Sequence, residues 1–147
     1  MFSTEDFGKI QWHDNAIHGF RILEGDTCGE LVFDIDFIAE WLPPLNGKYS
    51  FKVAPSSLTF HEVSDLVISI NYAEASAAVQ PMTIHEIQRE SITYPNGYKS
   101  FRWKVDINWL PKSFFSFCSP GFSQLQRMEP ITTEAQYLSP SERGVGL

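Results

Sequence analysis

Hydrophobic and polar residues alternate along several stretches of the chain. Between Leu31 and Phe37 apolar side chains occupy every second position, and Asp34 and Asp36 fall between them. In an extended strand, successive side chains point to opposite faces, so a period of two separates an apolar face from a polar one. The stretches 66–72 and 101–109 include alternating runs of the same kind. The pattern therefore predicts β-strands that pack one face against a core.

Clusters of Gly, Pro and Asn divide the chain into short segments of this type, and such clusters are typical of turns. The segments between them predict strands at 16–24, 30–40, 49–53, 58–62, 65–72, 83–94, 98–109, 113–118 and 122–128. Parallel pairing requires repeated crossover helices, which the sequence does not supply. We therefore expect an all-β fold, a single-domain antiparallel β-sandwich or open barrel that spans residues 1–130.

The C-terminal residues 131–147 lack a regular apolar pattern. Thr, Ser, Glu, Pro and Gly are scattered through this segment. A segment that cannot bury enough apolar surface to offset its conformational entropy stays disordered. The sequence therefore predicts a mobile C-terminal tail. In an alternative arrangement, Tyr137 and Leu138 pack back onto the body of the protein or onto a partner.

The dipeptide Asn96-Gly97 predicts a hairpin between two long predicted strands, because it accepts the positive φ angles of tight hairpin turns. A competing interpretation makes residues 83–90 a short helix. Thr83 and Glu86 have the spacing of a capping box, and a helix here would make the fold α+β.

The length of the hairpin turn decides what faces Trp103. A two-residue turn places polar side chains of the first strand on the aromatic face, where they would line a ligand cavity. These polar side chains are Glu86, Gln88 and Glu90. A longer turn that includes Pro95 places Arg89 and Ile87 there instead. We weigh this second register, or a position at the rim, above the cavity.

The chain is acidic, and this narrows its partners. Its 147 residues include 11 Lys and Arg against 18 Asp and Glu, a formal net charge of −7. Such a charge repels nucleic-acid phosphates, so we expect no nucleic-acid partner.

No apolar run reaches the length of a membrane span, and the first residues lack the pattern of a signal peptide. Cys28 and Cys118 lack CxxC spacing and favour free thiols in a reducing compartment, with a single long-range disulfide as the alternative. We expect a cytoplasmic protein with no membrane partner.

Five residues in or near the first two predicted strands carry side chains that bind divalent metals: His13, Asp14, His18, Asp34 and Asp36. Neighbouring His and Asp side chains can share a metal or act as acid and base. The competing interpretation, which we favour, places the carboxylates on the solvated side of an edge strand and makes Asp14 a turn residue. A metal-binding domain or small metal-dependent hydrolase is therefore an alternative function, and no other cofactor is expected.

The common motifs of nucleophilic enzymes are absent from the sequence. There is no GxSxG elbow, no Ser-x-x-Lys and no Gly-rich phosphate loop, and Cys118 lies in an apolar run that keeps a thiol unreactive. Catalytic sites are defined by geometry rather than by sequence position, so this observation only disfavours an enzyme.

Trp12-His13-Asp14, Ile17 and the run from Leu31 to Asp36 resemble the opening of some small bacterial β-rich proteins. Several families of this kind are uncharacterised, and some are similar to immunity proteins of bacterial toxin systems. The likeness ends at Trp41. It implies a cytoplasmic protein that binds and neutralises a toxin domain without catalysis.

These observations favour a non-catalytic protein-binding domain, immunity-like or adaptor. Large rigid aromatic side chains dominate interface energetics, and carboxylates steer a basic partner. The predicted contact residues are Asp34, Asp36, Glu40, Tyr94, Tyr98 and Trp109, with Tyr49 as a further aromatic candidate. A small-molecule carrier, with the polar hairpin residues facing a cavity, is the remaining alternative.

Overall fold

The structure, a computed structural model, describes residues 1–76, 80–108 and 110–144. This part of the chain forms nine β-strands, a 3₁₀-helix and a short α-helix. In chain order these are β1 Phe2–Ser3, η1 Thr4–Lys9, β2 Ala16–Leu23, β3 Gly29–Leu45, β4 Lys48–Ser69, β5 Met82–Thr93, β6 Lys99–Ile107, β7 Phe114–Ser119, β8 Gly121–Gln126, β9 Ile131–Thr133 and α1 Pro140–Arg143. The strands pair antiparallel. The predicted all-β antiparallel fold is confirmed.

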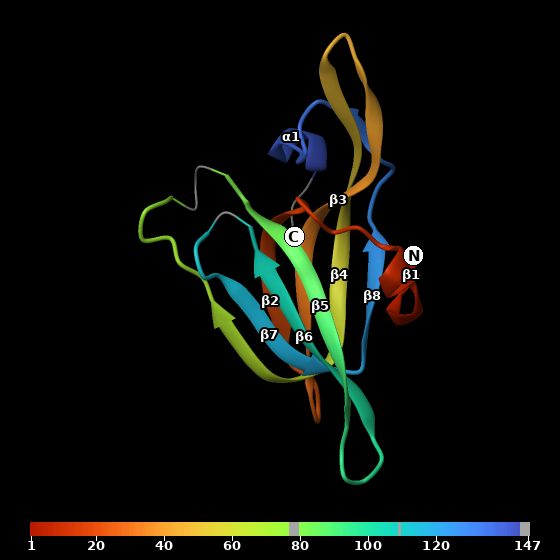
Figure 1. The fold of residues 1–147 in the computed structure, drawn as a ribbon, viewed down its shortest axis with the longest axis vertical. Helices are drawn as coiled ribbons and strands as arrows, with labels where there is room; N and C mark the ends of the chain where they lie inside the picture. The colour runs from red at the N-terminus through yellow and green to blue at the C-terminus, as the bar shows by residue number, and fades with distance from the viewer. Residues whose placement is uncertain (77–79, 109, 145–147) are drawn as a thin grey trace.

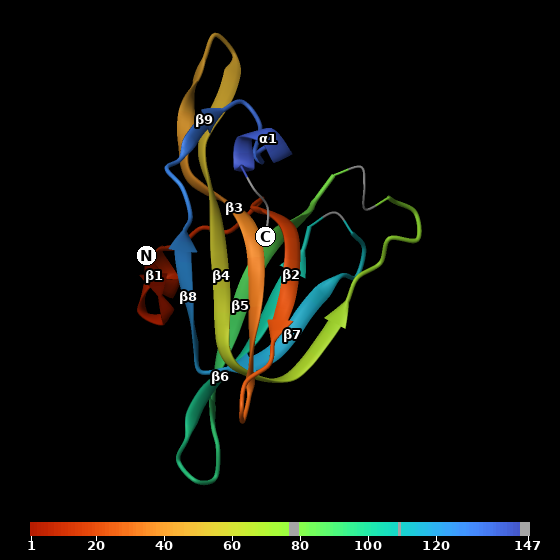
Figure 2. The same cartoon turned by 180° about the vertical axis from the view of Figure 1, so that it is seen from behind.

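The main strands lie in two layers, which Figures 1 and 2 show from opposite sides. Strands β8, β4, β3 and β2 follow one another in the first layer, and β5, β6 and β7 form the second. Hydrogen bonds join the layers at both margins, because β2 pairs with β5 and β4 pairs with β7. The sheet therefore closes around one core.

Aromatic side chains from both layers fill this core. The ring of Phe60 on β4 lies 6.1 Å from that of Phe33 on β3, and 5.0 and 4.7 Å from those of Trp103 and Phe117 in the second layer. All four side chains are fully buried. Burial of each large apolar side chain contributes about 2–3 kcal/mol. The aromatic residues at alternate strand positions thus hold the two layers together.

Strand β4 passes from the first layer to the second. The sequence predicts three separate strands here, at 49–53, 58–62 and 65–72, and this division is wrong. Glu62 and Asp65 adopt positive φ angles of 48° and 53°, which bend the strand without ending it. Before the bend β4 pairs with β3 and β8, and after it with β7.

The alternative helix at 83–90 is also wrong, because this segment lies within strand β5. A register shift between Ile84 and Glu86 inserts an extra residue into the strand. Ile84 and Ile87 therefore both point into the core, although they are three positions apart. A β-bulge accounts for the spacing that resembles a helical pattern.

The β5–β6 hairpin has the longer of the two predicted turns. The N–H of Tyr94 donates to the carbonyl of Tyr98 at 2.8 Å, and Gly97 adopts a φ of 87°. Such a three-residue loop ends in a left-handed residue, which suits glycine. Arg89 consequently lies opposite Trp103. The polar residues Glu86, Gln88 and Glu90 are exposed, so the register that points them at the core is wrong. Gln88 and Glu90 line an open surface pocket of about 590 Å³ together with Arg89 and Trp103.

The β3–β4 hairpin projects from the body as an arm, here defined as residues 39–51 (top of Figure 1). The described pairs between β2 and β3 end at Asp36, so only β4 accompanies β3 beyond this region. Asn46 and Gly47 form the turn with φ angles of 53° and 75°, the left-handed geometry that a tight hairpin turn uses.

Residues 131–144, here called the strap, cover the outer face of β3. Strand β9 pairs with β4 at the base of the arm. Leu138 is buried in a second, small apolar cluster with Ile38, Phe51 and Val53. The strap ends in α1, which buries no residue of its own. The segment that the sequence predicts as a tail thus contacts the body of the protein in this structure, and Figure 2 shows it beside the arm.

Candidate functional site

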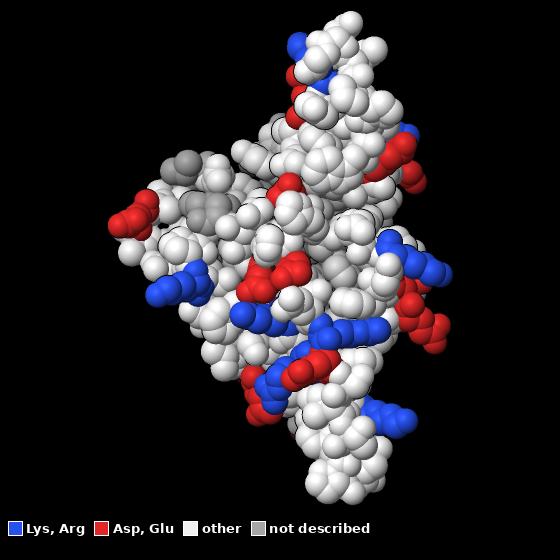
Figure 3. Space-filling view, viewed as in Figure 1, with Lys and Arg blue, Asp and Glu red and all other residues white. Residues whose placement is uncertain are grey.

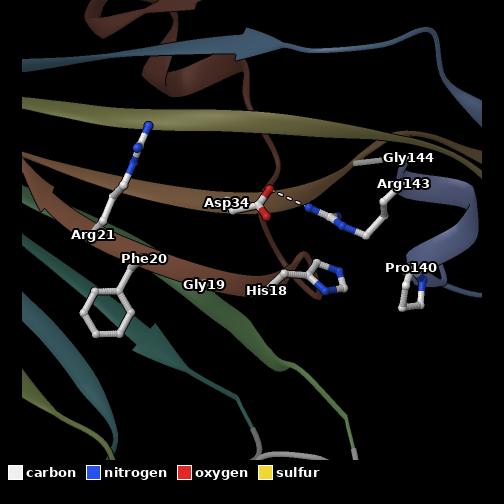
Figure 4. Close-up of a pocket in the computed structure, with 8 residues that line it drawn as sticks. All are labelled: His18, Gly19, Phe20, Arg21, Asp34, Pro140, Arg143 and Gly144. Carbon is white, nitrogen blue, oxygen red and sulfur yellow. Dashed lines mark hydrogen bonds and ion pairs between the residues drawn. The ribbon is translucent and has the colours of Figure 1, made fainter. Parts of the chain in front are cut away.

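A network of buried charges lies between the strap and the outer face of β3. Asp36 is completely buried and accepts hydrogen bonds from the backbone N–H of Leu138 and from Nε2 of His18, each at 2.7 Å. Arg143 of α1 extends across both carboxylates, with Nη1 paired to Asp36 and Nη2 lying 2.5 Å from Oδ1 of Asp34. Figure 4 shows Arg143 reaching from α1 toward Asp34.

A second guanidinium completes the neutralisation of charge. Arg127, which follows β8, pairs with the same carboxylate oxygen of Asp34 that Arg143 contacts, and it also donates to the hydroxyl of Ser57. Two carboxylates thus face two guanidinium groups. Buried charges of this kind are tolerated because each is paired and hydrogen-bonded, and loss of one partner leaves another charge uncompensated.

His18 is the neutral member of the network. Burial, followed by the positive charge of Arg143, lowers the pKa of His18 to about 4. The ring is therefore uncharged at neutral pH. Because a carboxylate only accepts hydrogen bonds, the contact with Asp36 requires the proton on Nε2 of His18.

A cavity of about 440 Å³ lies beside this network, lined by His18, Asp34, Arg143 and residues of β2 and α1. Asp34, the acidic residue that lines the cavity, is already engaged by Arg127 and Arg143, so it is neither a free base nor a free metal ligand. The arrangement pairs each carboxylate with at least one guanidinium group. Its evident effect is to attach the strap to β3.

The predicted metal ligands fall into two separate places. His13 and Asp14 contact each other, with 3.2 Å between Nδ1 and Oδ2, whereas His18, Asp34 and Asp36 belong to the arginine network. In residues 1–76, 80–108 and 110–144 no group of three or more His, Cys, Asp or Glu side chains is placed to hold a metal ion.

The solvated edge-strand interpretation of Asp34 and Asp36 is wrong as well. Strand β3 lies between β2 and β4, and both carboxylates are buried beneath the strap. Buried and paired with arginine, they do not present free charge that would steer a partner. The alternation in the sequence correctly separates them from the core face, but it does not show that another segment covers their own face.

The predicted contact residues outside the network are dispersed. Glu40 lies on the arm and pairs with Lys52 at 3.4 Å. Tyr94 and Tyr98 stack on each other at the tip of the β5–β6 hairpin, which points away from the arm. Trp109 lies outside the described residues.

An aromatic groove of about 740 Å³ lies between the arm and the strap. Trp41 and Tyr49 of the arm are 51% and 64% exposed, and Tyr137 of the strap is 39% exposed. The ring of Trp41 packs edge-on against Phe51, with centroids 5.0 Å apart, so it is held in place on the groove wall. We call this feature, lined by these four residues together with Pro81 and neighbouring polar residues, the aromatic groove.

The charged residues that line the aromatic groove are acidic. Asp14 and Glu134 contribute carboxylates, and no Lys or Arg is among the described residues that line it. Glu134 is exposed and has Lys48 as a distant partner at 3.9 Å. Figure 3 shows charged side chains of both signs on and beside the arm and across the lower half of the molecule.

Sequence reasoning identified Tyr49 but missed Trp41, Arg127 and Arg143. The cluster Pro43, Pro44, Asn46 and Gly47 signals a turn shortly after Trp41, which places Trp41 near the end of a hairpin. No comparable local signal links Arg143 to Asp36, since 107 positions separate them.

Among the described residues, no helix is both long and apolar enough to span a membrane. No family model, curated protein or solved structure matches this chain.

Proposed function

We propose that this chain is a non-catalytic protein-binding domain that uses the aromatic groove to bind a basic surface of another protein. The observation that carries the proposal is the exposure of Trp41, Tyr49 and Tyr137 along one groove. Large aromatic side chains with a fixed orientation lose little entropy on binding and are enriched among the residues that dominate interface energetics.

The chemistry of the groove favours a partner with basic side chains beside an apolar segment. Asp14 and Glu134 border the aromatic residues, and the chain as a whole has a formal net charge of −7. Complementary charge accelerates association and disfavours acidic partners. An immunity-like role, in which the partner is a toxin domain, is the specific form of this function that the sequence resemblance implies.

Pro43 and Pro44 favour contact through side chains over pairing through the backbone. Both lie on β3 within the arm, where β3 has no strand on its other side among the described pairs. Proline lacks the N–H that an added strand requires, so such an edge resists strand addition. We therefore expect the partner to contact the face of the arm.

The test compares two exposed aromatic residues of the arm with an exposed tyrosine at the opposite end of the molecule. A partner is cross-linked in the native cells, identified, and titrated against the purified chain. We expect Trp41→Ala and Tyr49→Ala each to weaken its binding by about tenfold or more. Tyr98→Ala, at the tip of the other hairpin, is the matched control and is expected to bind like the unmodified protein. Unchanged affinity in both arm variants, or a loss confined to Tyr98→Ala, would falsify the proposal.

A further inference from the structure

The strap supplies one wall of the aromatic groove. Its residues Glu134, Ala135, Gln136 and Tyr137 line the groove opposite side chains of the arm. The two walls therefore come from segments far apart in sequence, and the groove has its observed shape only while the strap lies against the body.

Few apolar contacts hold the strap. Strand β9 forms three residue pairs with β4, Leu138 is its only fully buried apolar side chain among the described residues, and α1 buries none. A segment with so little buried apolar area opens locally at a low free-energy cost unless other interactions retain it.

The charge network attaches the strap to β3. Asp36 accepts the backbone N–H of Leu138 at 2.7 Å, directly after Tyr137 of the groove wall. Arg143 reaches Asp36 and Asp34 with two different nitrogens, which anchors the other end of the strap. Its side chain is only 8% exposed, so water competes poorly for these contacts.

We infer that the ion pair between Asp36 and Arg143 controls the aromatic groove by holding the strap in place as its wall. The inference rests on the proposed function only in treating the groove as a binding surface. When Arg143 releases Asp36, the carboxylate is no longer held where it accepts the backbone N–H of Leu138. Tyr137 then leaves the groove, and Trp41 faces solvent without the strap beside it.

Arg127 offers a matched control for this mechanism. It also pairs with Asp34, but it precedes the strap and donates to Ser57 on β4. Arg127→Gln removes a guanidinium from the same network without removing an anchor of the strap, whereas Arg143→Gln removes the anchor itself.

The first measurement is amide hydrogen exchange on the complete chain, with no partner present. Arg143→Gln is expected to accelerate exchange of the Leu138 amide by about tenfold or more while core amides such as that of Phe33 exchange as before. Arg127→Gln is expected to leave Leu138 unchanged. Equal exchange at Leu138 in the unmodified protein and in Arg143→Gln would overturn the inference, as would equal acceleration throughout the chain.

The second measurement follows the groove through the indole N–H resonance of Trp41. Arg143→Gln is expected to shift this resonance and to leave that of the buried Trp103 in place, because Trp41 lines the groove with the strap whereas the indole N–H of Trp103 donates to Ser119 in the core. If Leu138 is released but Trp41 does not shift, the strap is not a wall of the groove and the inference is rejected.

A milder variant guards against a general loss of structure. Ser139→Ala removes the capping hydroxyl of α1 but touches neither layer. It is expected to move both signals in the same direction by a smaller amount, and no movement of either counts against the inference. Neither measurement requires a partner, so their failure is distinct from failure of the proposed function, which the affinity of the arm variants decides.

Discussion

The backbone N–H of Leu138 donates a 2.7 Å hydrogen bond to the carboxylate of Asp36, which lies 102 positions earlier in the chain. This bond joins the last segment of the protein to the centre of its first layer. It also explains why a charged residue occupies a buried position in β3, since the carboxylate satisfies donors that the strap brings to it.

Replacement of Asp36 by Asn tests the energetic importance of this position. The amide has nearly the same shape, but it removes the negative charge that pairs with Arg143. Its NH2 group also donates hydrogen bonds, and it would face His18 and the N–H of Leu138, which donate as well. We expect the free energy of unfolding, measured by urea denaturation, to fall by about 3–5 kcal/mol, as for other broken buried ion pairs. Glu40→Gln, which breaks the exposed pair with Lys52, is the control and should cost less than about 1 kcal/mol. Similar losses in the two variants would contradict this assignment.

His18 predicts a specific dependence of stability on pH. Its pKa is about 4 in the folded protein and near 6.5 in the unfolded chain, so between these values only the unfolded chain binds the proton. The stabilising contribution of neutral His18 is therefore complete above about pH 6.5 and is lost as the pH falls to 4. Relative to His18→Gln, the unmodified protein should lose roughly 3 kcal/mol of unfolding free energy over this interval. Urea denaturation at several pH values measures this difference, and a constant difference from pH 7 to pH 4 would refute it.

Gly97 is expected to be intolerant of a side chain. Its φ of 87° lies in the left-handed region, where a Cβ atom is strained even though open space surrounds it. Gly97→Ala should lower the free energy of unfolding by about 1 kcal/mol. Gly19→Ala adds the same methyl group to β2, where nothing lies within 4 Å and no such φ occurs, and should change stability by less than about 0.5 kcal/mol. Thermal or urea unfolding distinguishes the two, and equal effects would argue against the turn geometry.

Phe60 joins the two layers, and its removal should weaken their contact. Its ring lies within 6.1 Å of the rings of Phe33, Trp103, Phe117 and Phe122. Phe60→Ala leaves a cavity among these rings and is expected to cost about 3–5 kcal/mol in urea denaturation. Leu125→Ala, at a position that is 54% exposed, provides the comparison and should cost much less. A small loss for Phe60→Ala would show that the layers do not depend on this contact.

The local alternation of apolar and polar residues was sufficient to predict most of the strands. Alternating residues such as Leu31, Phe33 and Ile35 predicted both the extended conformation and the core face of β3, because strand geometry repeats every two residues. The pattern was misleading where the backbone departs from that repeat. The β-bulge after Ile84 gives the apolar residues a spacing that resembles a helical pattern. The sequence also predicted separate strands in a segment that is one strand, bent at the positive φ angles of Glu62 and Asp65.

The aromatic groove was only partly visible in the sequence. Tyr49 was a candidate because large rigid aromatic side chains dominate interface energetics, but its neighbours in the groove depend on which segments cross the arm. Tyr137 reaches the groove through the path of the strap, and no periodicity in the sequence reports such a path.

The order of the amino acids alone determined that this protein is an antiparallel all-β domain, since side-chain alternation and turn chemistry act between near neighbours. Only the tertiary structure decided the environment of Asp34 and Asp36. Whether a carboxylate meets water, a metal or an arginine depends on residues brought to it from distant positions, here Arg127 and Arg143. Electrostatic partnership depends on distance in space, and the folding of the strap over β3 sets that distance.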